Sequence, residues 1–396
     1  MRKVILFNII SIILLFYLVE VGFEMYLGPY AINTTKGSRL IKAVSEFGGS
    51  DMTREEYLFR NWIASQKKYP EMVGLTWVKN ADVNLKKTGF IPLRGKANAP
   101  TIMCNETGEM RTFKSDEYGF NNDAGAHSEK NIDLILIGDS FTEGFCVARS
   151  DNIAGNLIKR GYSTLNLGSG GSDPVWQQAI LREYAAGHED AYLVWIFYEG
   201  NDLLSIKESK KLLPYYIDDP AFTQSLKEKQ GLINSMVEEF TQKKVSECED
   251  ALSPLGRLKS ILKLNHVRKK LCAVGIEINR NGVRWVSHKD HRYVYDQTFE
   301  KIMREVKKEY GKLIFVYLPS ASEYFKNTNF DYKKDEVLAY MNSIGASIID
   351  MSNELDTWKR EDLFVKDVYG HYSPKVYNEI SIKIDTLLKQ SNQSGR

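Results

Sequence analysis

The chain has 396 residues, of which 43% are hydrophobic and 26% are charged, and its formal net charge is +2. This length and composition are typical of a globular protein with one α/β domain plus appendages. Its lysines and arginines form no basic tract, so the charge pattern argues against a nucleic-acid partner.

The N-terminal segment predicts a membrane anchor. Two basic residues precede the run Val4–Val19, which is apolar apart from Asn8 and Ser11 and is long enough for a short or tilted transmembrane helix. The exit Glu20–Met25 lacks an Ala-x-Ala cleavage pattern, which favours an uncleaved single-pass anchor over residues 1–23 rather than a cleaved signal peptide. The basic residues predict a cytoplasmic N-terminus, so the rest of the chain is expected outside the cytoplasmic membrane, in the periplasm or at the cell surface.

The sequence predicts a tether and a lead-in of loops and short strands over residues 24–130, and the main domain over residues 131–390. Apolar runs there alternate with helical patterns over Ile153–Arg160 and Pro174–Ala186, which implies a parallel sheet. The five predicted strands are Leu134–Ile137, Thr164–Leu167, Leu193–Tyr198, Leu313–Leu318 and Ser347–Ile349.

A lysine-rich insertion at about 205–292 interrupts this alternation between the third and fourth strands. Its helical patterns cover Phe222–Lys243 and Leu255–Lys270, and we expect it to cap the site.

The four cysteines fit an oxidising compartment without defining a pairing. Cys248 and Cys272 flank a helical stretch of the insertion, Cys104 precedes the first core strand, and Cys146 follows its end. Four cysteines allow three connectivities, and free buried thiols are an equally open interpretation. No Cys-x-x-Cys spacing or His/Cys cluster indicates a metal site.

The most informative motif is Gly138-Asp139-Ser140, at the end of the first core strand. A serine at the carboxyl end of a buried strand lies where open α/β sheets bind their ligands. Gly138 and Gly144 allow a tight turn that lifts the hydroxyl out of the sheet. We therefore interpret Ser140 as a nucleophile, although Asp-Ser is also an ordinary helix N-cap.

Three further segments follow strands or lie in a late loop: Asn166–Gly171, Tyr198–Asp202 and Asp367–Pro374. Together with the first motif they present Ser, Gly, Asn and His in this order, which resembles the four blocks of the SGNH (GDSL-type) hydrolase family. The resemblance covers roughly residues 115–205 and 312–388. The segment Asp116–Phe120 is similar to the lead-in of membrane-tethered members related to polysaccharide O-acetyltransferases and esterases.

The resemblance implies a three-layer α/β/α sandwich with a flavodoxin-like, parallel, five-stranded sheet. It also implies that Ser140 attacks an ester carbonyl, that His371 removes the hydroxyl proton, and that Asp367 orients the imidazole. The Gly171 backbone N–H, the Asn201 side-chain amide and the Ser140 N–H would form the oxyanion hole. Independent of the family, a serine needs an adjacent base to become nucleophilic, and preorganised donors stabilise the intermediate's negative oxygen.

Two departures from the family pattern leave alternatives open. The acidic residue usually precedes the histidine by two or three positions, whereas Asp367 precedes His371 by four. Asp362 or a backbone carbonyl is therefore a second candidate for orienting the imidazole. The third block has Glu199 where a first glycine is common, so its turn geometry is open.

The function expected from these residues is serine-dependent acyl-ester hydrolysis or O-acyl transfer. By resemblance, the substrate is an O-acyl group of a cell-surface glycan, and neither a cofactor nor a metal is required. The alternative is a catalytically inert member of the same fold that binds glycan within an export or assembly complex. The oligomeric state is not predicted.

Overall fold

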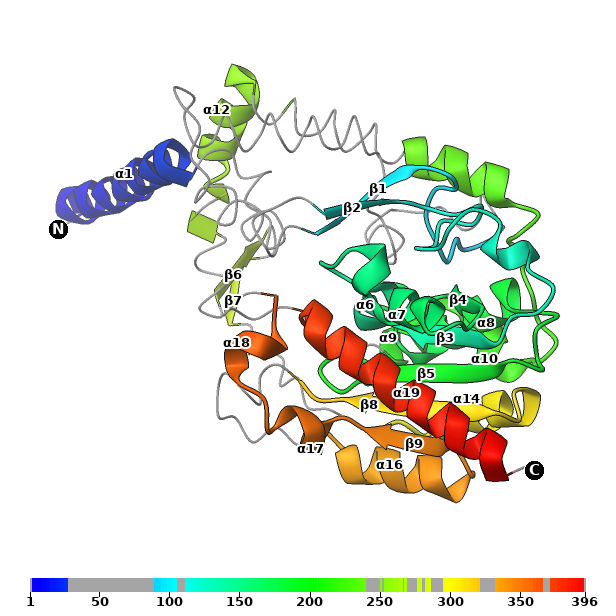
Figure 1. The fold of residues 1–396 in the computed structure, drawn as a ribbon. Coiled ribbons are helices and arrows are strands. Elements are labelled where there is room, and N and C mark those ends of the chain that lie inside the picture. Colours follow the sequence, from blue (N-terminus) through cyan, green and yellow to red (C-terminus); the bar gives the residue numbers. More distant parts are fainter. Residues whose placement is uncertain are drawn as a thin grey trace, which may run out of the picture. The chain divides into compact units, whose positions relative to one another are not determined.

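The computed structural model describes residues 2–27, 89–104, 111–204, 206–239, 250, 253–265, 267–268, 276–279, 282–285, 295–320, 332–365 and 371–394 (Figure 1). The chain divides into two compact units. One comprises residues 1–68 and 240–291, and the other comprises residues 69–239 and 292–396.

The larger unit is built on a five-stranded sheet in which all strand pairs are parallel. The spatial order β4-β3-β5-β8-β9 places the first core strand between the second and the third. The strands are β3 (Leu134–Gly138), β4 (Thr164–Asn166), β5 (Tyr192–Tyr198), β8 (Leu313–Leu318) and β9 (Ser347–Asp350). This confirms the α/β class and all five predicted strands, with their ends shifted by at most one residue.

Helices cover both faces of this sheet (Figure 1). On one face, α7 (Ile153–Lys159) and α19 (Pro374–Ser394) pack on alternate residues of the strands, including Leu136, Val194 and Val316. On the other face lie α8 (Pro174–Tyr184), α14 (Gln297–Glu309) and α16 (Lys334–Ser343). Outside the insertion, this unit also contains the short helices η2 (Ala126–Ser128), α6 (Ser140–Glu143), η3 (Arg149–Asp151), α17 (Ser352–Leu355) and α18 (Arg360–Leu363).

Side-chain caps determine where the sheet-covering helices begin. The Asn152 side chain accepts a hydrogen bond from Gly155 N, Asp173 accepts from Val175 N, and Asp296 accepts from Thr298 N. Such caps satisfy N–H groups that have no partner within the helix. The predicted helices at Ile153 and Pro174 therefore begin at the expected residues and end one or two residues early.

The lead-in belongs to the same unit and contains an antiparallel hairpin of β1 (Pro100–Cys104) and β2 (Arg111–Lys114). Met103 and Phe113 form a small apolar cluster with Cys146, which lies just beyond the turn that follows Ser140. Cys146 is disulfide-bonded, so the free-thiol interpretation is wrong for this residue.

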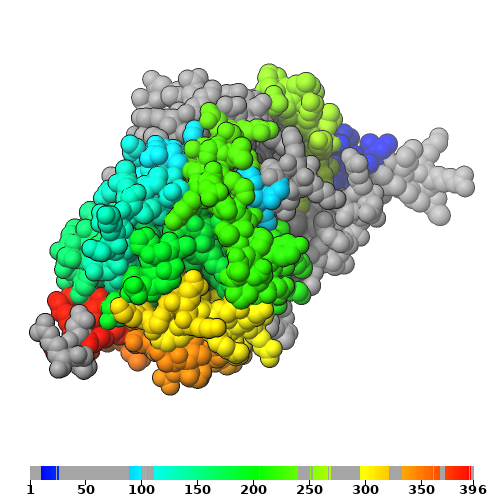
Figure 2. Space-filling view, turned by 90° about the vertical axis from the view of Figure 1, so that its right-hand side faces the viewer, coloured from blue at the N-terminus to red at the C-terminus, as the bar shows by residue number. Residues whose placement is uncertain are grey.

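The first part of the insertion belongs to the same unit. It contains α9 (Ile206–Leu212), α10 (Pro214–Asp218) and a helix over 230–239. Gln224 and Gln230 bond to the lead-in backbone at Ile91 and Gly95, and Figure 2 shows this green segment beside the cyan lead-in.

The prediction of a helix over Phe222–Lys243 is wrong for its first two turns. Residues 222–229 form a loop because the buried carboxylate of Glu183 accepts hydrogen bonds from Thr223 Oγ1 at 3.0 Å and Leu226 N at 2.8 Å. These bonds hold the backbone outside a helical conformation, and Ser225 has a φ of 54°.

The smaller unit contains α1 (Arg2–Leu27), α12 (Pro254–Leu262) and a hairpin of β6 (Ile276–Asn279) and β7 (Gly282–Trp285). The helix predicted over Leu255–Lys270 is interrupted after α12 at residues 263–264, where Leu264 adopts a φ of 51°, and residues 265, 267 and 268 are helical again. Within α1, the buried Glu20 carboxylate accepts a hydrogen bond from Val267 N at 2.7 Å.

Across the parts of the chain that the structure describes, no helix is both long and apolar enough to cross a membrane. The transmembrane character predicted for residues 1–23 is therefore not supported.

Candidate active site

Ser140 lies where β3 ends and α6 begins, nearly buried, in a turn that tolerates no side chain at Gly138. A Cβ at Gly138 would lie 2.1 Å from Thr142 Oγ1 and 2.4 Å from the Ile196 carbonyl oxygen. The close return of the chain therefore requires glycine at this position. It places the serine at the carboxyl end of the sheet, as the sequence predicts.

His371 lies beside this serine, 231 residues further along the chain. Its Nε2 is 2.8 Å from Ser140 Oγ, which is hydrogen-bonding distance for proton transfer. The ring packs against Phe141 and Phe145, with centroid separations of 4.8 Å and 4.6 Å. The structure thus brings the predicted nucleophile and the predicted base together.

The loop that carries His371 is fixed on both sides of the imidazole. Val365 N donates to the His371 carbonyl at 3.2 Å, and Ser373 N donates to the Leu363 carbonyl at 2.8 Å. The buried Tyr372 hydroxyl donates to the Pro319 carbonyl at the end of β8. These bonds hold the imidazole before the start of α19.

The predicted orienting acid, Asp367, lies outside the described residues. The second candidate, Asp362, is 39% exposed, and its carboxylate lies 3.1 Å from Lys375 Nζ. Its described ion pair is therefore with a surface lysine.

Asp139 is a fully buried carboxyl directly before the nucleophile. It accepts hydrogen bonds from Phe141 N at 2.9 Å and from Asn201 Nδ2 at 3.1 Å, so it caps α6 and holds the third block. Burial raises the pKa of the Asp139 carboxyl, and these two hydrogen bonds act in the opposite direction. The geometry agrees with a supporting role for this residue.

Asn201 follows β5 and faces the same strand end. Its amide carries two N–H donors, and one of them bonds to Asp139. The neighbouring Asp202 is also fully buried and accepts from Tyr198 N at 3.1 Å. Burial, followed by the nearby charge of Asp139, raises the pKa of the Asp202 carboxyl well above its usual range.

Glu199, the departure in the third block, has a structural explanation. Its buried carboxylate accepts hydrogen bonds from the Tyr317 hydroxyl and from Ser320 N at the end of β8. The glutamate therefore ties the end of β5 to its neighbouring strand. Gly200 then supplies the tight turn, because a Cβ there would lie 2.4 Å from the Tyr198 ring.

The glycine-rich segment after β4 lies against the nucleophile. Ser169 N donates to the Gly138 carbonyl at 3.0 Å, and a Cβ at Gly170 would lie 3.7 Å from Ser140 Cβ. Gly170 N donates to Glu143 at 2.8 Å. Among the described residues, the N–H of Gly171, whose φ is 74°, has no acceptor.

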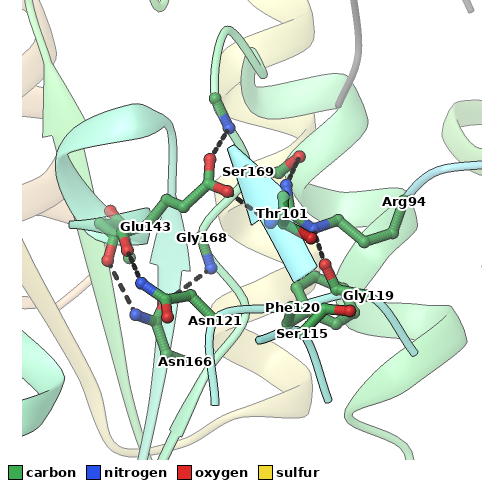
Figure 3. Close-up of polar contacts among 12 residues, drawn as sticks. Arg94, Thr101, Ser115, Gly119, Phe120, Asn121, Glu143, Asn166, Gly168 and Ser169 are labelled. Carbon is green, nitrogen blue, oxygen red and sulfur yellow. Dashed lines mark hydrogen bonds and ion pairs between the residues drawn. The ribbon is translucent and has the colours of Figure 1, made fainter. Parts of the chain in front are cut away.

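A polar cluster that the sequence pattern does not predict lies next to this segment (Figure 3). It centres on the buried ion pair of Arg94 and Glu143. Asn121 donates to the Glu143 carbonyl at 2.9 Å, and Asn166 donates to the Thr142 carbonyl at 3.0 Å. The one available signal was the position of a glutamate three residues after the nucleophile.

Within the described ranges, no group of three or more His, Cys, Asp or Glu side chains is arranged to hold a metal ion. No protein-family model matches the chain, and no curated protein matches it either.

Proposed function

We propose that the chain is an SGNH-type serine esterase or O-acyltransferase that works through a Ser140 acyl-enzyme. The observation that carries the proposal is the 2.8 Å contact between His371 Nε2 and Ser140 Oγ at the carboxyl end of a parallel sheet. The strand order, second-first-third-fourth-fifth, is that of flavodoxin-like sheets and supports the finer fold assignment.

In the proposed reaction, His371 takes the hydroxyl proton while Ser140 Oγ bonds to the carbonyl carbon of the ester. The carbonyl electron pair moves onto oxygen, where the N–H groups of Gly171, Ser140 and Asn201 would stabilise it. Collapse breaks the ester bond, and the imidazolium gives its proton to the departing alcohol. Water or a sugar hydroxyl then accepts the acyl group by the same steps in reverse.

The proposed substrate is an O-acyl group on a cell-surface glycan, and the proposed location is outside the cytoplasmic membrane. The substrate class rests on the resemblance in the sequence. The disulfide at Cys146 supports the location, because disulfides persist in oxidising compartments.

The proposal is tested by turnover of p-nitrophenyl acetate by the full chain in detergent, with and without added oligosaccharides. Release of p-nitrophenol without a sugar acceptor identifies an esterase. Release that rises with a sugar, together with acetylated sugar by mass spectrometry, identifies a transferase. If no condition gives p-nitrophenol release that depends on Ser140, the proposal is contradicted.

Replacing Asn201 by alanine is expected to lower kcat by about 10²–10³-fold with little change in KM, because one donor to the oxyanion is lost. Steady-state kinetics measures the effect. The matched control is Asn378→Ala, because the side-chain amide of this half-buried asparagine on α19 bonds only to Arg160 within the described structure, and its loss should leave kcat unchanged. A loss of less than about threefold in Asn201→Ala would assign the residue to fold support alone.

A further inference from the structure

The lead-in contributes a buried cation, Arg94, to the polar cluster around Glu143 (Figure 3). Arg94 is 4% exposed and its guanidinium pairs with the carboxylate of Glu143 on α6. The same guanidinium donates to the Gly119 carbonyl at 2.8 Å and to Ser169 Oγ at 3.2 Å. It also lies over the Phe120 ring, 5.2 Å from the centroid. One side chain therefore joins the lead-in, α6 and the loop after β4.

Glu143 uses its two carboxylate oxygens for two different segments. Oε1 accepts from Arg94, and Oε2 accepts from Gly170 N at 2.8 Å. Glu143 is also three residues after Ser140 on the same helix, so the carboxylate links the nucleophile rigidly to the glycine-rich loop. With a donor on each oxygen and little exposure, this carboxylate is poorly placed to exchange protons with a substrate.

The bond to Gly170 sets the orientation of the loop at the point where it passes Ser140. Because Gly170 N–H is directed at Glu143, it is not available to an oxyanion. The next N–H along the chain, at Gly171, has no acceptor within the described structure. If the peptide planes of the loop could rotate freely, the Gly170 N–H would not stay bonded to Glu143 and the Gly171 N–H would not keep its orientation.

Stability alone is a weak reason for such a pair, because burying two charges costs desolvation energy that their attraction often does not exceed. The pair can instead position the loop precisely. The Glu143 carboxylate holds the Gly170 N–H, and the Arg94 guanidinium holds the carboxylate. A displacement of about 1 Å at a catalytic group lowers the rate by about 10²-fold.

We infer that Arg94 and Glu143 are positioning residues that hold the 168–171 loop so that Gly171 N–H faces the oxyanion of the reaction at Ser140. This inference rests on the proposed function for its catalytic consequence. The loop geometry itself does not depend on that function, and it is measured separately.

The test compares Glu143→Ala and Glu143→Gln with the wild-type full chain. Glu143→Ala removes the acceptor of Gly170 N–H, so kcat should fall by about 10²-fold while KM stays within about threefold. Glu143→Gln keeps one acceptor oxygen, so its kcat should lie between that of the wild type and that of Glu143→Ala. Amide hydrogen exchange of a peptide covering residues 168–172 should quicken by about tenfold in Glu143→Ala, while peptides from β3 and β5 keep wild-type rates.

The matched control is Glu305→Ala, which breaks the ion pair of Glu305 with the buried Arg182 between α8 and α14. It should leave kcat and exchange of the 168–172 peptide unchanged. If Glu143→Ala does not fold, Glu143→Gln must by itself lower kcat at least about threefold and quicken loop exchange.

Two outcomes separate this inference from the proposed function. Folded Glu143 variants with wild-type loop exchange would overturn the positioning role, whatever the activity. Faster loop exchange in a protein without any Ser140-dependent turnover would support the positioning of the loop and overturn the proposed function.

Discussion

Replacing Ser140 by alanine is expected to lower kcat/KM for p-nitrophenyl acetate by at least about 10⁴-fold, because the residual rate comes only from binding and oxyanion donors. The fold should persist, since in the described structure the Ser140 hydroxyl bonds only to His371. Steady-state rates and a thermal unfolding curve measure both quantities.

The control for this substitution is Ser352→Ala. Ser352 is 8% exposed, as is Ser140, and it lies at the start of α17. Its loss should leave turnover within about twofold of wild type. Turnover by Ser140→Ala at more than about one hundredth of the wild-type rate would show that another residue performs the chemistry.

His371→Ala is expected to cause a comparable loss, because without a base the serine hydroxyl is a weak nucleophile. The loss should be partly reversed by added imidazole, which can enter the space between Phe141 and Phe145. Since the two residues act as one unit, Ser140→Ala/His371→Ala should be no less active than Ser140→Ala alone.

His188→Ala provides the comparison for His371→Ala, because His188 lies in the loop before β5 and should tolerate truncation. Rescue by imidazole is the result that a purely structural role of His371 would not produce. Activity of His371→Ala within about tenfold of wild type would remove the histidine from the mechanism.

The core of the fold was predictable because its strands are buried on both faces. Runs such as Leu134–Ile137 and Leu313–Leu318 are continuous and apolar, and glycine, proline or polar residues bound them. Buried parallel strands have this pattern, which identifies both their type and their ends. Ser140 and Asn201 follow such runs, so their shared strand edge was predictable as well.

The polar support of the site was not predictable from local patterns. Arg94 and Glu143 are 49 residues apart in the sequence, and each by itself resembles a surface residue. Only the tertiary structure shows that both are buried and joined. The loop at 222–229 was not predictable for the same reason, because its hydrogen-bond acceptor, Glu183, lies about 40 residues earlier.

Covalent labelling of the full chain with a fluorophosphonate, read by intact mass and peptide mapping, determines whether Ser140 is the nucleophile. One adduct on Ser140 is expected in the wild-type protein. None is expected in Ser140→Ala, and labelling should be at least about 10²-fold slower in His371→Ala. A wild-type chain that remains unlabelled, or is labelled at another residue, would exclude Ser140 as the nucleophile and favour an inert glycan-binding protein or a different nucleophile.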